Sequence, residues 1–151
     1  MSENKINAIT DERLRNLLVE VALEWERRFA IAPRITDAIG EYDAAKLVGT
    51  SIRIGMGRDR GDTAVKKGFD FKKEDTLYQV KSNRPSGKLG STVTLVGKAK
   101  NFDWNRLIWI LYDSQYDIVE AYQFANNEYK RLFEKKKRLS PDDMRKGDKL
   151  V

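Results

Sequence analysis

Three polar residues lie where a strand hairpin would bring their side chains together. Asp70 belongs to one short run, and Gln79 and Lys81 share a face of the next run because side chains alternate along a strand. Mg²⁺ prefers carboxylate, neutral oxygen and water ligands, so the Asp70 carboxylate, the Gln79 amide oxygen and the Val80 carbonyl would form half of a coordination shell. Lys81 would place positive charge where phosphodiester hydrolysis develops negative charge. We therefore predict a Mg²⁺ site in which Mn²⁺ can substitute; the pattern leaves open whether one or two ions bind.

Composition narrows the chemistry further. The 151-residue chain contains no cysteine and no histidine. Their absence excludes thiol catalysis, structural zinc sites with Cys or His ligands, and the Ser-His-Asp and Cys-His triads. Any hydrolytic reaction must therefore use carboxylates, amides, lysines and a cation that prefers oxygen ligands.

The elements that would position these residues follow from periodicity and from helix- and turn-forming residues. Apolar residues recur at helical spacing over 10–30, with Thr10 or Asp11 as N-cap. Thr36 or Asp37 is expected to cap a second helix, which runs toward Gly49. A basic loop is expected over 50–67. The hairpin pairs 68–72 with 77–82, which puts Phe69 and Phe71 on one face and Asp70 on the other. The later elements are a strand start or helix start at 92–96, a buried strand at 107–112 containing Trp109, a neighbouring strand at 117–123, a basic helix after 126 and a short helix capped at Ser140.

The whole chain, 1–151, is expected to form a single domain, because it contains no repeat and no low-complexity linker. Its start lacks the pattern of a signal peptide, and no apolar run approaches the ~20 residues that span a bilayer. We expect a cytoplasmic protein without a membrane partner. The net charge of +6 favours a polyanionic partner such as nucleic acid.

The stretches Gly68-Phe69-Asp70 and Tyr78-Gln79-Val80-Lys81-Ser82 resemble the motif of the PD-(D/E)XK nuclease superfamily, which includes many type II restriction endonucleases, in the variant with glutamine at the middle position. The resemblance implies an α/β fold with a restriction endonuclease-like core, in which a central mixed β-sheet is flanked by α-helices. It also implies that Asp70 and Gln79 bind the metal ion and that Lys81 contacts the attacking water and the scissile phosphate.

Two positions depart from that pattern. Phe69 replaces the proline that precedes the aspartate, and Gln79 is neutral, so the site lacks one acid. In such nucleases a helical glutamate before the hairpin often contributes, and Glu41 occupies that place. We therefore add Glu41 to the catalytic and metal-binding residues. Asp62 is the alternative to Asp70 as metal ligand.

The expected function is that of a Mg²⁺-dependent deoxyribonuclease that cuts double-stranded DNA, acting as a sequence-specific restriction endonuclease and as a homodimer or higher homo-oligomer. The alternatives are a homing, repair or junction-resolving nuclease of the same fold, or an inactive DNA-binding module. The candidate DNA contacts are Arg53, Arg58, Arg60, Ser82, Arg84 and Lys88, although Ser82 could instead simply end its strand. The basic stretch 130–138 fits either a phosphate-tracking surface or a solvated helix face. Burial is predicted for Trp109, whereas Trp104 is left open between the core and a base-stacking surface.

Overall fold

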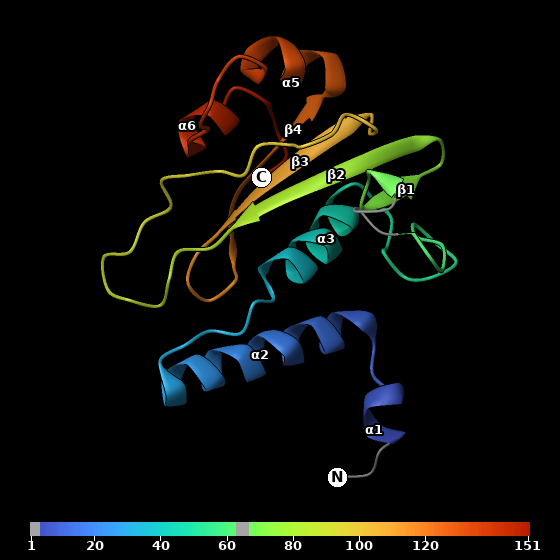
Figure 1. Cartoon of the computed structure of the whole chain (residues 1–151). Helices are drawn as coiled ribbons and strands as arrows, with labels where there is room; N and C mark the ends of the chain where they lie inside the picture. The colour runs from blue at the N-terminus through green and yellow to red at the C-terminus, as the bar shows by residue number, and fades with distance from the viewer. Residues whose placement is uncertain (1–3, 63–66) are drawn as a thin grey trace. The chain divides into compact units, whose positions relative to one another are not determined.

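The described strands of the chain form a five-stranded sheet (Figure 1). The computed structural model describes residues 4–62 and 67–151. The strands are β1 (Phe71–Lys73), β2 (Thr76–Asn83), β3 (Arg106–Tyr112), β4 (Ile118–Ala125) and β5 (Asp148–Lys149), which neighbour one another in that order. Because β2 and β3 run parallel while the other pairs are antiparallel, the sheet is mixed, as predicted.

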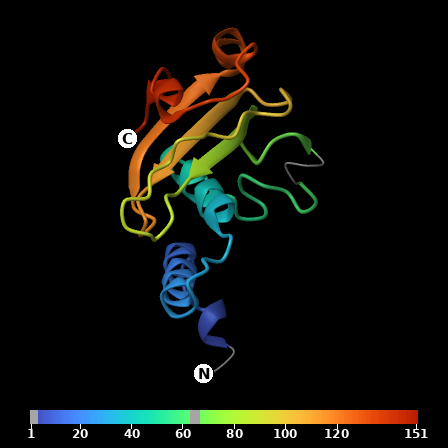
Figure 2. The same cartoon turned by 60° about the vertical axis from the view of Figure 1, so that its left-hand side comes forward.

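Helices cover both faces of this sheet (Figure 2). The helix α3 (Thr36–Leu47) packs on the face of Val80 and Ser82, while α5 (Asn126–Phe133) and α6 (Pro141–Met144) contribute to a core on the face of Trp109. Lys81 pairs in register with Trp109, so Lys81 lies on the α5 face. The α/β class and the flanked mixed sheet predicted from the sequence are confirmed.

The strand β3 is apolar because both of its faces are covered. Leu107, Ile108, Trp109 and Ile110 are completely buried, which confirms the burial predicted for Trp109. Trp104, left open by the sequence, is buried in the same cluster as Trp109.

The residues before β2 depart from the predicted hairpin. The pairing begins only at Phe71, opposite Tyr78, and residues 68–70 lie outside the strand, after a bend at Gly68, where φ is +79°. Phe71 stacks on Tyr78 with ring centroids 4.8 Å apart, whereas Phe69 joins the cluster of Trp109. The prediction that Phe69 and Phe71 share a face is therefore wrong, because strand alternation does not extend through the bend.

The connection between β2 and β3 also differs from prediction. Residues 92–95 form neither strand nor helix, and Val96 makes an isolated bridge with Leu139. The predicted strand or helix start at 92–96 is therefore wrong, because the run pairs with another segment only at Val96.

The chain divides into two compact units, Met1–Ile35 and Thr36–Val151. The first contains α1 (Asn4–Asn7), which the sequence did not predict, and α2 (Asp11–Phe29), which matches the predicted helix. The Thr10 hydroxyl accepts a hydrogen bond from the Arg13 N–H at 3.1 Å, as an N-cap should. Among the described residues no helix combines the length and the apolar character needed to cross a membrane.

In the second unit, α3 begins at Thr36, so both predicted caps, Thr36 and Asp37, lie in its first turn, and it ends shortly before Gly49. The short helix α6 has the predicted cap: Ser140 Oγ accepts from the Asp143 N–H, and the Asp143 carboxylate accepts from the Ser140 N–H.

A buried hydrogen bond ties α3 to β3. The Tyr112 hydroxyl donates to the Asp43 carboxylate at 2.5 Å, and both side chains are buried. Tyr112→Phe leaves that buried carboxylate without this donor, so we expect the free energy of unfolding to fall by about 2 kcal/mol. Urea denaturation followed by circular dichroism measures this loss. The matched control is Tyr122→Phe, whose hydroxyl bonds Glu120, a partly exposed carboxylate that also pairs with Arg145, and whose loss should cost under about 0.5 kcal/mol. Equal losses in the two variants would contradict the expectation.

Candidate active site

Asp70 is fixed against the edge of β2 by two hydrogen bonds. Its backbone N–H donates to the Tyr78 carbonyl at 2.8 Å, and its Oδ2 accepts from the Val80 N–H at 2.7 Å. The N–H and C=O of one strand residue point to the same side of the strand, so the Val80 carbonyl faces the side on which Asp70 lies. Two of the three predicted oxygen ligands, Asp70 and Val80, thus adjoin one another.

Gln79 and Lys81 flank this point on β2. Gln79 is buried, and its Oε1 has no hydrogen-bond partner in the described part of the chain. A buried amide oxygen without a partner is unfavourable, and a cation would satisfy it. The carboxylate of Asp70, the amide oxygen of Gln79 and the carbonyl of Val80 are oxygen donors of the kind that Mg²⁺ prefers. The Lys81 side chain runs alongside Gly97.

Glu41, on α3, is linked to Asp70 through Arg58. The Arg58 guanidinium forms an ion pair with the Glu41 carboxylate and donates to the Asp70 backbone carbonyl at 2.8 and 3.1 Å. Both side chains of the ion pair are largely buried. Arg58, predicted from the sequence as a DNA contact, is thus placed among the site residues. Arg58 thus connects its own loop to Glu41 on α3 and to Asp70 before β1.

Burial perturbs both acids. Burial raises the pKa of Glu41, and the negative charge of Asp70 raises it further, while Arg58 opposes the shift. Burial also raises the pKa of Asp70, against the opposing effects of the Val80 N–H, Arg58 and Lys81. The negative charge of Asp37 raises the pKa of both groups. Perturbed carboxyls of this kind often mark functional sites.

Asp37 is the residue that the sequence reasoning missed as a member of the site. The sequence predicts Asp37 only as a helix cap, yet it lies one helical turn before Glu41, and residues four apart share a helix face. That spacing was the available signal. Even so, no three acidic side chains of residues 4–62 and 67–151 come close enough to hold a metal ion by themselves. An ion here would depend on the amide and carbonyl oxygens beside Asp70.

The helix carrying these acids lies very close to β2. A Cβ on Gly40 would be 2.7 Å from the Ser82 Cβ, so only glycine fits without a shift. The Ser82 hydroxyl donates to the Thr36 carbonyl at 3.2 Å. Ser82, a candidate phosphate contact, therefore lies in the contact between α3 and β2, on the opposite face from Lys81.

The other predicted residues lie apart from this cluster. Arg84 donates to the Ser114 carbonyl and lies over the Tyr116 ring, 4.9 Å from its centre, so it braces the β3–β4 turn. Asp62 accepts from the Asp59 N–H at 3.0 Å and closes a turn of the basic loop. Arg53, Arg60 and Lys88 are exposed. Residues 63–66 of the predicted basic loop lie outside the described residues.

Neither family models nor curated proteins match this chain. The functional assignment therefore depends on the site itself.

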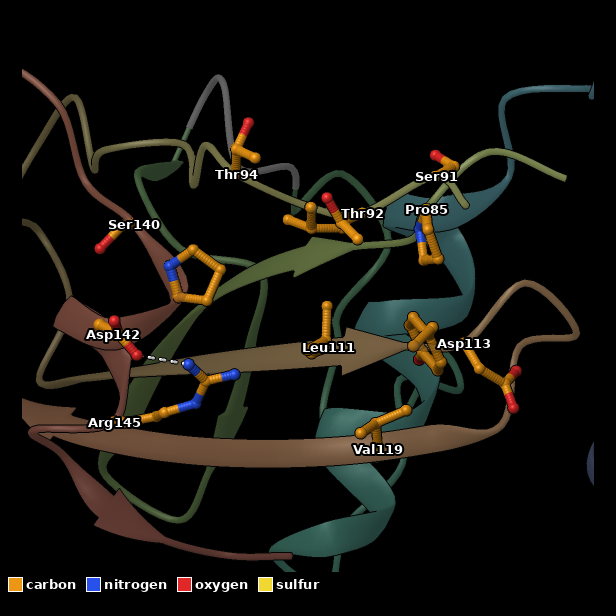
Figure 3. A pocket seen from close by; sticks show the side chains of 13 residues that line it. Pro85, Ser91, Thr92, Thr94, Leu111, Asp113, Val119, Ser140, Asp142 and Arg145 are labelled. Carbon is orange, nitrogen blue, oxygen red and sulfur yellow. Dashed lines mark hydrogen bonds and ion pairs between the residues drawn. The ribbon is translucent and has the colours of Figure 1, made fainter. Parts of the chain in front are cut away.

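A pocket of about 540 Å³ lies elsewhere, and it is lined by Pro85 and residues 91–94, by the end of β3 and the start of β4, and by residues in and next to α6 (Figure 3). Leu111 and Val119 line its apolar part. The Arg145 guanidinium forms ion pairs with Asp142 and with Glu120. None of the residues predicted for the site lines this pocket, so it plays no part in the proposed chemistry.

A hydrolytic activity at this site would depend on pH, because both acids have raised pKa values. If Glu41 and Asp70 act as anions, the rate of such a reaction would fall as the pH decreases through their folded-state pKa values, which lie above the ordinary carboxyl range of about 4. Glu41→Gln should lower the rate roughly 10- to 100-fold, as loss of a supporting group at a metal site does. It should also move the acid limb of the pH–rate profile to lower pH, because one of the two perturbed groups is gone. A profile identical to that of the wild type would show that Glu41 takes no part.

Proposed function

We propose that this protein is a Mg²⁺-dependent endodeoxyribonuclease that hydrolyses double-stranded DNA, with a PD-(D/E)XK-type site in the glutamine variant. Two observations carry the proposal. The Asp70 carboxylate accepts from the Val80 N–H, and the buried Oε1 of the neighbouring Gln79 has no hydrogen-bond partner among residues 4–62 and 67–151, with Lys81 two residues after Gln79 on the same strand. The mixed sheet with helices on both faces supports a restriction endonuclease-like core.

Asp70, Gln79 Oε1 and the Val80 carbonyl would hold Mg²⁺, or Mn²⁺ in its place. The bound ion would lower the pKa of a water molecule and balance charge on the phosphate. Lys81 would orient the attacking water and stabilise the negative charge that develops as the new phosphorus–oxygen bond forms and one ester bond breaks. Glu41 would add negative charge to the site, and Arg58 would hold Glu41 near Asp70.

DNA binding would use cations that are exposed on the surface. Arg53, Arg60 and Lys88 have no assigned catalytic role and suit contacts to phosphates. We expect a restriction-type enzyme acting as a homodimer, because two symmetric copies supply one site for each DNA strand.

Incubation with phage DNA and Mg²⁺, followed by gel electrophoresis, tests the proposal. Discrete bands are the expected result, with no cleavage when EDTA replaces Mg²⁺. A smear would contradict sequence specificity while supporting nuclease activity. Intact DNA with a gel shift would overturn the proposed nuclease activity and favour a DNA-binding module. Cleavage confined to a four-way junction, a mismatch or a long asymmetric site would instead indicate a resolving, repair or homing role.

A further inference from the structure

The helix α2 carries a row of large apolar side chains in solvent. The exposed fractions are 47% for Leu14, 41% for Leu18, 61% for Val21, 50% for Trp25 and 57% for Phe29. The Trp25 and Phe29 rings pack edge to face at 4.8 Å, which leaves them side by side on the surface. A continuous exposed apolar row on one helix is typical of an interaction surface.

The spacing of this row is that of a helix-pairing seam. Leu14, Leu18, Val21 and Trp25 follow one another at alternating intervals of four and three residues, the heptad spacing of a and d positions. Extended by one interval in each direction, the same seam reaches Asp11 at the start of α2 and Arg28 near its end. The seam therefore has an apolar middle, an acidic start and a basic end.

We propose that this seam pairs with the same seam of a second copy of the chain, with the two α2 helices antiparallel. Leu14 then packs against the partner's Trp25, and Leu18 packs against the partner's Val21. At each end Asp11 meets the partner's Arg28. Every seam position finds an apolar or oppositely charged counterpart, as a two-fold symmetric interface requires.

Charge complementarity is what selects the second copy and the antiparallel direction. A parallel pair would place Asp11 against the partner's Asp11 and Arg28 against the partner's Arg28, and like charges repel. Arg28 uses its Nε to bond Glu24 at 2.6 Å, and a guanidinium has further N–H donors for a second carboxylate. This proposal rests on α2 alone and does not depend on the nuclease assignment.

The apolar half of the proposal is tested by Val21→Glu in the full chain. The wild type is expected to sediment as a dimer of the 17.5 kDa chain, with association that strengthens with concentration. In the proposed pair, Val21 packs against the partner's Leu18 twice, once from each chain. Val21→Glu would bury a carboxylate at both of these central contacts and should weaken dimerisation at least about 100-fold. The matched control is Leu89→Glu, at a fully exposed apolar residue outside the seam, which should leave the dimer intact. A wild-type monomer at all concentrations, or a dimeric Val21→Glu variant, would overturn the proposal whatever the DNA-cleavage result.

The direction of pairing is tested by exchanging charges at the two ends. Asp11→Arg alone and Arg28→Asp alone each place like charges together at both ends, so each should dimerise roughly tenfold more weakly than the wild type. A mixture of these two variants should form heterodimers, because the arginine introduced in one chain then meets the aspartate introduced in the other. The double variant should recover dimerisation. If neither single substitution changes the dissociation constant, antiparallel pairing through Asp11 and Arg28 is wrong.

Discussion

Asp70→Asn is expected to lower the rate of Mg²⁺-dependent DNA cleavage by at least about 1,000-fold. The substitution removes the charged metal ligand of a site whose other proposed ligands, Gln79 and the Val80 carbonyl, are neutral. The asparagine Oδ1 can still accept from the Val80 N–H, so the backbone contact that fixes residue 70 is kept. Initial cleavage rates over a range of Mg²⁺ concentrations measure the effect.

The same variant should not unfold the protein. Because burial raises the folded-state pKa of Asp70 above its unfolded value, the native state binds the proton more tightly than the unfolded chain does. The free energy of unfolding therefore decreases as the pH rises through the unfolded-state and folded-state pKa values of Asp70. At neutral pH the ionised Asp70 carboxylate thus destabilises the folded state. Asp70→Asn should be at least as stable as the wild type at pH 7 by thermal denaturation. Asp75→Asn, the same chemical change at an exposed position of the hairpin turn, is the control for activity and should cleave normally. Near-normal cleavage by Asp70→Asn would overturn the proposed centre.

Lys81→Ala is expected to reduce kcat about 100- to 1,000-fold, the usual effect of removing one group that stabilises transition-state charge. The lysine is proposed to act on the charge that develops during reaction, so kcat should fall much more than the affinity for DNA. Single-turnover cleavage and a DNA-binding titration in Ca²⁺ separate the two effects. The control is Lys149→Ala, which removes an equal charge from the exposed strand β5, three strands away from β2 in the sheet. It should change neither kcat nor the affinity for DNA strongly. A loss confined to DNA affinity would make Lys81 a binding residue only.

The sequence predicted the sheet and the long helices because their signals are local. The apolar run of β3, the Thr10 cap and the Ser140 capping box each act within a few residues. The bend at Gly68 and the irregular segment 92–95 were missed because their conformation depends on packing against distant parts of the chain.

The candidate site was predictable to the same extent. Strand alternation correctly predicted that Gln79 and Lys81 lie on the same face of β2. The hairpin pattern correctly predicted that Asp70 lies next to that strand. The place of Arg58 between Glu41 and Asp70 depends on how a loop folds back onto α3, and no spacing rule specifies that. The contribution of Asp37 could have been found from its four-residue separation from Glu41.

The close contact at Gly40 controls how near α3 lies to the strand β2. The absence of a side chain at Gly40 sets the distance between the helix that carries Asp37 and Glu41 and the strand that carries Gln79 and Lys81. Even a methyl group there would push the two elements apart, and a displacement of about 1 Å at a catalytic centre can cost 100-fold in rate. The distance from Asp37 and Glu41 to Lys81 therefore depends in part on the missing side chain of Gly40, a residue that itself takes no part in the chemistry.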